Sequence, residues 1–144
     1  MVEMDVLYTG DLHCSIKHGP SGGTLVTDAP KDNQGRGEAF SPTDLVGAAL
    51  GSCILTLMGI YAKRHNIDIT GATAHVSKEM ATAPSRRIGK ITIKVKLPNR
   101  IPPEQRQVFE NAARACPVGL SLHPDLQQVL EFKYEECEAA RACA

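Results

Sequence analysis

Apolar and polar residues alternate over short distances at the start of the chain. Residues 4–8, 11–16 and 24–28 are brief β-favouring segments separated by glycines and prolines. This pattern predicts an opening antiparallel meander of strands. The polar stretch 28–40, DAPKDNQGRGEAF, follows and is expected to form a loop.

The residues that follow this loop predict the start of a helix. Ser41 is suited to cap a helix, Pro42 suits the first helical position, and Asp44 stands where a capping box places its acid. We therefore predict a helix that begins at Pro42 and continues to about His65.

This long helix carries no charge over the 17 residues 46–62. The run is shorter than the ~20 apolar residues that a membrane-spanning helix needs. In a soluble protein, a helix that is apolar on all sides is expected to be buried on all sides. We therefore expect it to form the centre of the core, with Gly47 and Gly51 offering a flat strip for close packing.

The second half of the chain returns to a period of two. Residues 72–78 alternate weakly, and residues 90–97 place four aliphatic side chains on one face: Ile91, Ile93, Val95 and Leu97. A sheet with one buried and one solvent-exposed face is typical of antiparallel strands. A last strand is expected over residues 129–135.

A second helix is expected to open at Pro102 and Pro103. Its apolar positions recur at i, i+3, i+4 and i+7, at Phe109, Ala112, Ala113 and Cys116. The order of strands, helix, strands, helix and strand predicts an α+β fold in which antiparallel sheets wrap a long buried central helix. We expect one domain, residues 1–144, with an exposed tail at 136–144.

Composition and charge narrow the function classes. Sixteen basic and 16 acidic residues give a net charge of zero, so electrostatics provide no reason to expect nucleic acid or a membrane surface as partner. The opening residues MVEMDVLY lack the features of a signal peptide. We therefore expect a cytosolic protein.

The cysteines point to free thiols rather than to a metal site. Five stand in the chain, at positions 14, 53, 116, 137 and 143, and no C-x-x-C pair occurs. A grouping of His13 and Cys14 with Cys116 and His123 around a metal is disfavoured, and we expect no metal and no organic cofactor. Cys14, Cys137 and Cys143 are interpreted as structural or surface thiols.

Cys53 is either a packing residue of the core or a reactive nucleophile. It lies on a helical row with Val46, Ala49, Leu50, Leu57 and Ile60, as a packing residue would. It stands eleven residues after Pro42, roughly 16 Å along the helix, where the helix dipole gives no help. A dry thiol with an ordinary pKa of about 8.5 is inert, so reactivity requires a cation delivered by tertiary contact.

Arg36, in the loop before the helix, is the candidate cation best placed by sequence, and Lys17, Arg64, Arg86 and Arg87 remain alternatives. Cys116 precedes Pro117, which disfavours continuation of the helix. It therefore places a thiol at a helix end. Two such thiols would allow attack and resolution if they met, and spacing alone leaves that open.

Taken together, SPTDLVGAALGSC (41–53) and AARACPVGLSL (112–122) resemble the paired cysteine motifs of the OsmC/Ohr family, the osmotically induced and organic hydroperoxide resistance proteins. The resemblance is colinear from about residue 7 to 134. It implies an intertwined homodimer and a cysteine-based peroxidase. Cys53 stands at the position of the peroxidatic cysteine and Cys116 at that of the resolving cysteine.

The resemblance also implies an activating arginine, for which Arg36 is the candidate, with Glu38 as the carboxylate that orients it. The glutamate of the family motif falls at Thr43, and we assign the neighbouring Asp44 to capping. Expected partners are an organic hydroperoxide, with hydrogen peroxide a second possibility, and an external thiol reductant of dithiol or lipoyl type. The chief alternative is a homodimer without catalysis that binds or senses a small apolar or thiol-reactive ligand; a slow hydrolase or transferase is a third.

Overall fold

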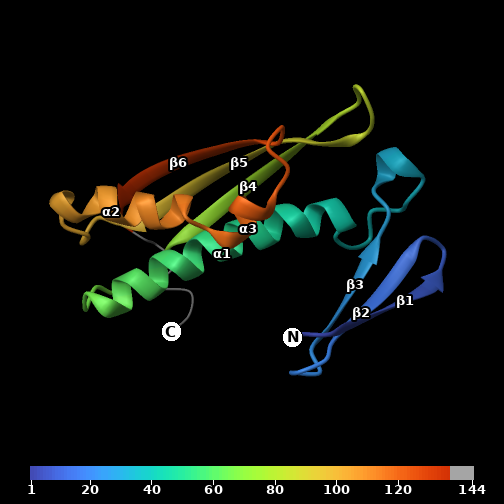
Figure 1. The fold of residues 1–144 in the computed structure, drawn as a ribbon, viewed down its shortest axis with the longest axis horizontal. Helices are drawn as coiled ribbons and strands as arrows, with labels where there is room; N and C mark the ends of the chain where they lie inside the picture. Colours follow the sequence, from blue (N-terminus) through green and yellow to red (C-terminus); the bar gives the residue numbers. More distant parts are fainter. Residues whose placement is uncertain (137–144) are drawn as a thin grey trace. The chain divides into compact units, whose positions relative to one another are not determined.

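The computed structural model describes residues 1–136 and shows the alternation of elements that the periodicity predicts (Figure 1). In chain order the elements are β1 Met4–Gly10, β2 His13–His18, β3 Thr24–Asp28, the 3-10 helix η1 Lys31–Asn33, α1 Pro42–Arg64, β4 Thr73–Ala81, β5 Arg87–Pro98, α2 Pro103–Arg114, α3 Pro117–Ser121 and β6 Gln127–Glu135. The α+β class is confirmed. Of the predicted tail, Glu136 is exposed and the remainder lies outside the described residues.

The chain divides into two compact units, residues 1–46 and residues from 47 onward. Each unit has its own three-stranded sheet, β1-β2-β3 in the first and β4-β5-β6 in the second. The expectation of one domain stays a prediction.

The first unit contains the predicted antiparallel meander. β2 pairs with β1 on one side and with β3 on the other. β2 begins at His13 rather than at residue 11, because Asp11 and Leu12 adopt positive φ angles of 50° and 64° and form the turn. The register places His13 directly opposite Asp28, at the end of the sheet.

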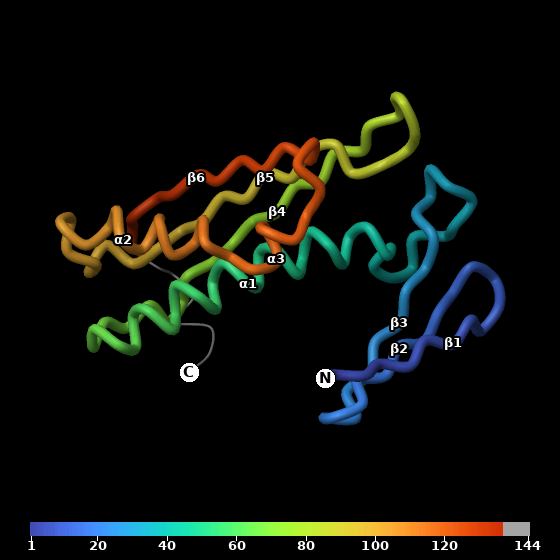
Figure 2. Tube along the Cα trace, viewed as in Figure 1, coloured from blue at the N-terminus to red at the C-terminus, as the bar shows by residue number. Residues whose placement is uncertain are grey.

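The loop after β3 returns to the strand that it leaves. The backbone N–H of Asp28 donates to the carbonyl oxygen of Phe40 at 3.1 Å, and Thr27 and Phe40 form an isolated parallel bridge. The path of this loop can be followed in Figure 2. The intervening residues are thereby held over the end of the sheet that carries Asp28.

The start of α1 is the capping box that the sequence predicts. The backbone N–H of Ser41 donates to Asp44 Oδ2 at 2.8 Å, and the N–H of Asp44 donates to Ser41 Oγ at 3.1 Å. The two residues thus satisfy two of the N–H groups that a helix start leaves unpaired. The assignment of Asp44 to capping is confirmed.

In the second unit β5 is the central strand and carries the core. Its four predicted inward side chains, Ile91, Ile93, Val95 and Leu97, are all buried. β4 pairs antiparallel with β5, as predicted. β6 pairs parallel with β5, so the antiparallel expectation is wrong for this pair. α2 and α3 form the crossover that a parallel connection requires.

From Gly47 onward, α1 packs along this sheet (Figure 1). A Cβ placed at Gly47 or Gly51 would lie 3.4 Å or 2.8 Å from a methyl group of Val76 in β4. The two glycines therefore form the close-packing strip that the sequence predicts, and a strand of the same chain occupies it.

The expectation that α1 is buried on every side is wrong for the single chain. Its buried residues from Gly47 onward follow one face: Gly47, Leu50, Gly51, Ile54, Met58 and Ala62. Residues of other faces, such as Ser52, Thr56 and Ile60, are exposed. By length and composition α1 could cross a membrane, with a mean hydropathy of 1.9 in its most apolar window; a helix of a protein core passes the same test.

Candidate functional site

Cys53 lies in the middle of α1 and is half-buried. The row to which the sequence assigned it is not the core row, since Ala49 and Ile60 are exposed. The core row passes through Leu50, Ile54, Met58 and Ala62, each about 1% exposed or less. Cys53 therefore lies at the border of the packed face, where part of the residue is exposed to solvent.

Cys116 lies between α2 and α3 and is 2% exposed. Its ψ of 122° is extended, as expected for a residue that precedes a proline. α2 accordingly ends at Arg114, and α3 begins at Pro117. The predicted helix break at this position is confirmed, and it turns the thiol toward the core.

The two thiols meet. Burial first, and the neighbouring side chain of Cys53 second, raise the pKa of the Cys116 thiol. A negative charge on Cys53 acts in the same direction, and the backbone N–H groups of Gly119 and Val118 act against it. The structure thus brings together the two residues whose proximity the sequence left open.

The short helix α3 is tied to β6 by one side chain. Gln128 Nε2 donates to the carbonyl oxygen of Gly119 at 2.9 Å. Within α3, Ser121 Oγ donates to the carbonyl oxygen of Pro117 at 2.8 Å. These bonds hold the backbone that follows Cys116.

Arg36 and Glu38 form an ion pair in the loop of the first unit. Arg36 Nη1 lies 3.8 Å from Glu38 Oε1, and the two side chains are 64% and 54% exposed. Glu38 is therefore in position to orient the guanidinium group of Arg36. The alternative cations lie at other positions in the fold: Lys17 in β2, Arg64 at the end of α1, Arg86 in the bend just before β5, and Arg87 at the start of β5.

Glu38 also takes part in a cluster that the sequence did not predict. Its Oε2 lies 3.2 Å from His13 Nε2, and Asp28 Oδ1 lies 3.7 Å from the same nitrogen. The backbone N–H of Glu38, which donates to Asp28 Oδ2, is the first cause that lowers the pKa of Asp28; the proximity of His13 also contributes. His13, at the start of β2, pairs with Asp28, at the end of β3. A count of residues along both strands from their connecting turn would therefore have placed these two residues opposite each other.

Thr43, at the position of the family glutamate, makes a hydrogen bond with the capping serine. Ser41 Oγ and Thr43 Oγ1 lie 3.1 Å apart. A hydroxyl group cannot provide the charge by which a carboxylate holds an arginine. The carboxylate that pairs with Arg36 is that of Glu38.

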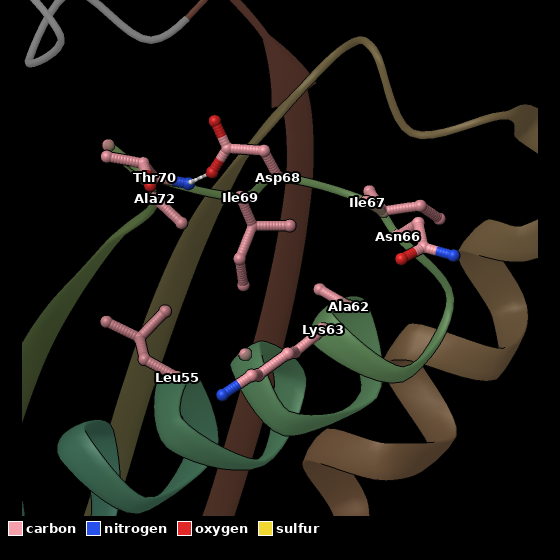
Figure 3. A pocket seen from close by; sticks show the side chains of 11 residues that line it. Leu55, Ala62, Lys63, Asn66, Ile67, Asp68, Ile69, Thr70 and Ala72 are labelled. Atoms are coloured by element: carbon pink, nitrogen blue, oxygen red, sulfur yellow. Dashed lines mark hydrogen bonds between the residues drawn. The ribbon is translucent and has the colours of Figure 1, made fainter.

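A separate groove of about 730 Å³ lies at the far end of α1, between that helix and residues 66–72 (Figure 3). Leu55, Gly59 and Ala62 line it from the helix. On the other side the N–H of Thr70 donates to Asp68 Oδ1 at 2.9 Å. Neither Cys53 nor Cys116 lines this groove, so it is not part of the thiol site.

Comparison with known proteins finds one matching family and several similar solved structures. Residues 35–130 match the family of OsmC-like proteins. A Psychrobacter arcticus protein assigned to osmotic stress and detoxification responses is 45% identical, with coverage of 92% of this chain and 96% of that one and a TM-score of 0.86. A search of curated protein sequences finds no match.

Two more distant solved structures share the fold. An OsmC-like protein from Mycoplasma pneumoniae is 15% identical over 94% of this chain and 97% of its own, with a TM-score of 0.78. The organic hydroperoxide resistance protein OhrB of Bacillus subtilis is 22% identical over 92% of this chain and 98% of its own, with a TM-score of 0.66.

Proposed function

Because this chain belongs to the OsmC-like protein family, we propose that it is a thiol-dependent peroxidase that reduces organic hydroperoxides. The observation that carries the proposal is the contact between the Cys53 and Cys116 side chains. A lone packing cysteine needs no second thiol beside it. The name of the Bacillus subtilis relative, an organic hydroperoxide resistance protein, supports the choice of substrate.

The reaction has three steps. The Cys53 thiolate attacks the terminal oxygen of the hydroperoxide; the O–O bond breaks, an S–O bond forms, and an alcohol leaves after taking a proton. The Cys116 thiol then attacks the sulfenic acid sulfur, forming the Cys53–Cys116 disulfide and releasing water. An external dithiol restores both thiols and is itself oxidised to a disulfide. Hydrogen peroxide would react by the same route and release water.

The burial of the two thiols supports this assignment of roles. Cys53 is half-buried, whereas Cys116 is 2% exposed. The raised pKa of Cys116 keeps it protonated at neutral pH, so it is poorly suited to attack the peroxide itself. Cys53 is therefore the nucleophile and Cys116 the resolving thiol.

We assign the activation of Cys53 to Arg36, with Glu38 orienting it. A guanidinium group stabilises the thiolate and the developing charge on the leaving oxygen. The ion pair of Arg36 with Glu38 supports this role, since a carboxylate at 3.8 Å restricts an exposed arginine. An Arg36→Lys variant, which keeps the charge and loses the fork of donors, should react more slowly with peroxide than the wild-type chain.

We further propose that the protein is a cytosolic homodimer. Several large apolar side chains of the first sheet are exposed in the single chain: Met4, Val6, Leu7, Tyr8, Leu25 and Val26. The outer face of α1 beyond Gly47 is also uncovered and carries no charge as far as Ala62, with Ile60 among its exposed residues. Apolar surface of this kind is characteristic of a protein–protein interface.

The decisive test is the mass of the intact, reduced protein after one equivalent of cumene hydroperoxide, followed by disulfide mapping. We expect a loss of about 2 Da, the two hydrogen atoms that disulfide formation removes. The bond should map to Cys53–Cys116, and Cys116→Ser should instead accumulate a sulfenic acid on Cys53. Cys14→Ser is the matched control, because Cys14 is also half-buried, and it should behave as the wild type.

An unchanged mass, with Cys53 also inert to alkylation, would overturn the proposal. It would favour the alternative, a dimer that binds or senses a small apolar or thiol-reactive ligand without turning it over. A disulfide that forms equally well in Cys53→Ser would refute the assignment of the nucleophile.

A further inference from the structure

Three metal-binding atoms converge in the first unit, outside the thiol site. They are His13 Nε2, Asp28 Oδ1 and Glu38 Oε2, and all lie within 4.8 Å of one another. The nitrogen is 3.7 Å from the Asp28 oxygen and 3.2 Å from the Glu38 oxygen. Ligands of a tetrahedral zinc ion at bond lengths of 2.0–2.2 Å are roughly 3.4 Å apart. These two separations match that value.

Asp28 presents an unsatisfied oxygen to this point. Its side chain is fully buried, and Oδ1 has no hydrogen-bond partner. The other oxygen, Oδ2, accepts the backbone N–H of Glu38 at 3.0 Å, which fixes the carboxylate with Oδ1 directed at His13. A buried carboxylate oxygen without a partner is costly, and a cation beside it removes that cost.

The histidine tautomer also suits a metal. His13 Nδ1 lies 2.7 Å from the carbonyl oxygen of Asp11, which can only accept, so Nδ1 carries the proton. In the neutral ring, Nε2 then directs a lone pair at two carboxylate oxygens. Metal-binding histidines commonly donate the other ring N–H to a backbone carbonyl in this way. If Nε2 also carried a proton, it would donate that proton to Glu38. Asp28 Oδ1, which lies 3.7 Å from Nε2, would still have no hydrogen bond.

The charge of the three side chains and the solvent access of Glu38 also favour a bound cation. Two carboxylates and a neutral imidazole carry a charge of −2, which one divalent cation balances. Glu38 is 54% exposed, so its side chain can adjust and the site is open to solvent on that side. The second oxygen of Glu38 is the one that faces Arg36, so an ion at Oε2 leaves that pair in place.

We propose that His13, Asp28 and Glu38 form a binding site for a divalent transition metal of the zinc type, with one histidine nitrogen and two carboxylate oxygens as ligands and water in the open position. Nitrogen and oxygen ligands in this number suit Zn²⁺. The cysteine spacing gave no reason to expect a metal, and no cysteine belongs to this group of ligands. The proposal does not depend on the peroxidase proposal, although the two share Glu38, whose Oε2 faces His13 and whose Oε1 faces Arg36.

The test is calorimetric titration of the tag-free, metal-free full chain with zinc chloride, with the thiols kept reduced by a phosphine. We expect one ion per chain. His13→Gln, Asp28→Asn and Glu38→Gln should each weaken binding at least about tenfold, the loss that even an outer-shell change causes. His18→Gln is the matched control; His18 lies in the same strand and bonds Ser21 Oγ, and its loss should leave binding unchanged.

Cobalt(II) provides a second readout that separates this site from the thiols. Cobalt bound by His13, Asp28 and Glu38 should show visible d–d bands without a thiolate-to-cobalt charge-transfer band, because no sulfur is a ligand. Glu38→Gln is decisive where Asp28→Asn fails to fold, since Glu38 is largely exposed. Absence of zinc uptake by the wild type, uptake that survives Glu38→Gln, or a thiolate charge-transfer band would overturn the proposal.

Discussion

The packing of α1 on β4 can be tested with a single methyl group at Gly51. A Cβ at this position would lie 2.8 Å from Val76 Cγ2 and 3.8 Å from Ala74 Cβ. Two carbon atoms are in optimal contact at about 3.5–4.0 Å, so the first contact is an overlap. Val76 is β-branched and held in β4, and its methyl groups cannot rotate away freely. Gly51→Ala therefore forces the helix and the strand apart.

The expected magnitude is a difference between two terms. Alanine in place of glycine in a helix interior stabilises by about 1 kcal/mol, and overpacking of a core costs about 1–3 kcal/mol. Gly51→Ala should therefore lie between neutral and about 2 kcal/mol destabilising. Gly59→Ala is the matched control, because no atom lies within 4 Å of its Cβ position; it should keep the full gain of about 1 kcal/mol.

Urea unfolding at one fixed chain concentration measures both variants, since association makes stability depend on concentration. In a Val76→Ala background, Gly51→Ala should lose its penalty, so that the double-mutant cycle shows coupling between the two positions. Equal stabilisation by Gly51→Ala and Gly59→Ala, or additivity with Val76→Ala, would refute the packing described here.

Two further predictions concern the thiol site. Because the pKa of Cys116 is raised in the folded chain, its contribution to stability is complete below the unfolded thiol value of about 8.5 and is lost as the pH rises through the folded value. The free energy of unfolding of the reduced wild type, minus that of Cys116→Ser, should thus fall as the pH rises above about 8; a constant or rising difference would contradict it. Gln128→Ala removes the bond to Gly119 and should cost about 0.5–1.5 kcal/mol and slow formation of the Cys53–Cys116 disulfide. Gln107→Ala, which removes a comparable bond to Asn111 on α2, should leave that rate unchanged, and equal rates in the two variants would show that α3 is held by other contacts.

Local patterns in the sequence predicted most elements, because each depends on near neighbours in the chain. The Ser41–Asp44 capping box acts over three residues. The alternation from Ile91 to Leu97 reports directly which side of β5 is dry. The break before Pro117 follows from steric contact between adjacent residues.

Two features escaped this reasoning because they depend on contacts between distant residues. α1 is apolar on all sides, so no periodicity tells which face packs; Val76, more than twenty positions later, selects the face with Gly47 and Gly51. The parallel pairing of β6 follows from the path of α2 and α3. Residues 91–97 alternate in the same way for either direction of the neighbouring strand.

The sequence by itself determined the class of the fold, the helix start and break, and the two cysteines to which we assign the proposed chemistry. Only the tertiary structure decided that the thiols of Cys53 and Cys116 meet and that His13, Asp28 and Glu38 share one point in space. The physical reason is the same in both cases. Proximity of side chains 63 positions apart, or at opposite ends of a hairpin and loop, is set by how whole elements pack, and residue type and spacing carry no direct record of it.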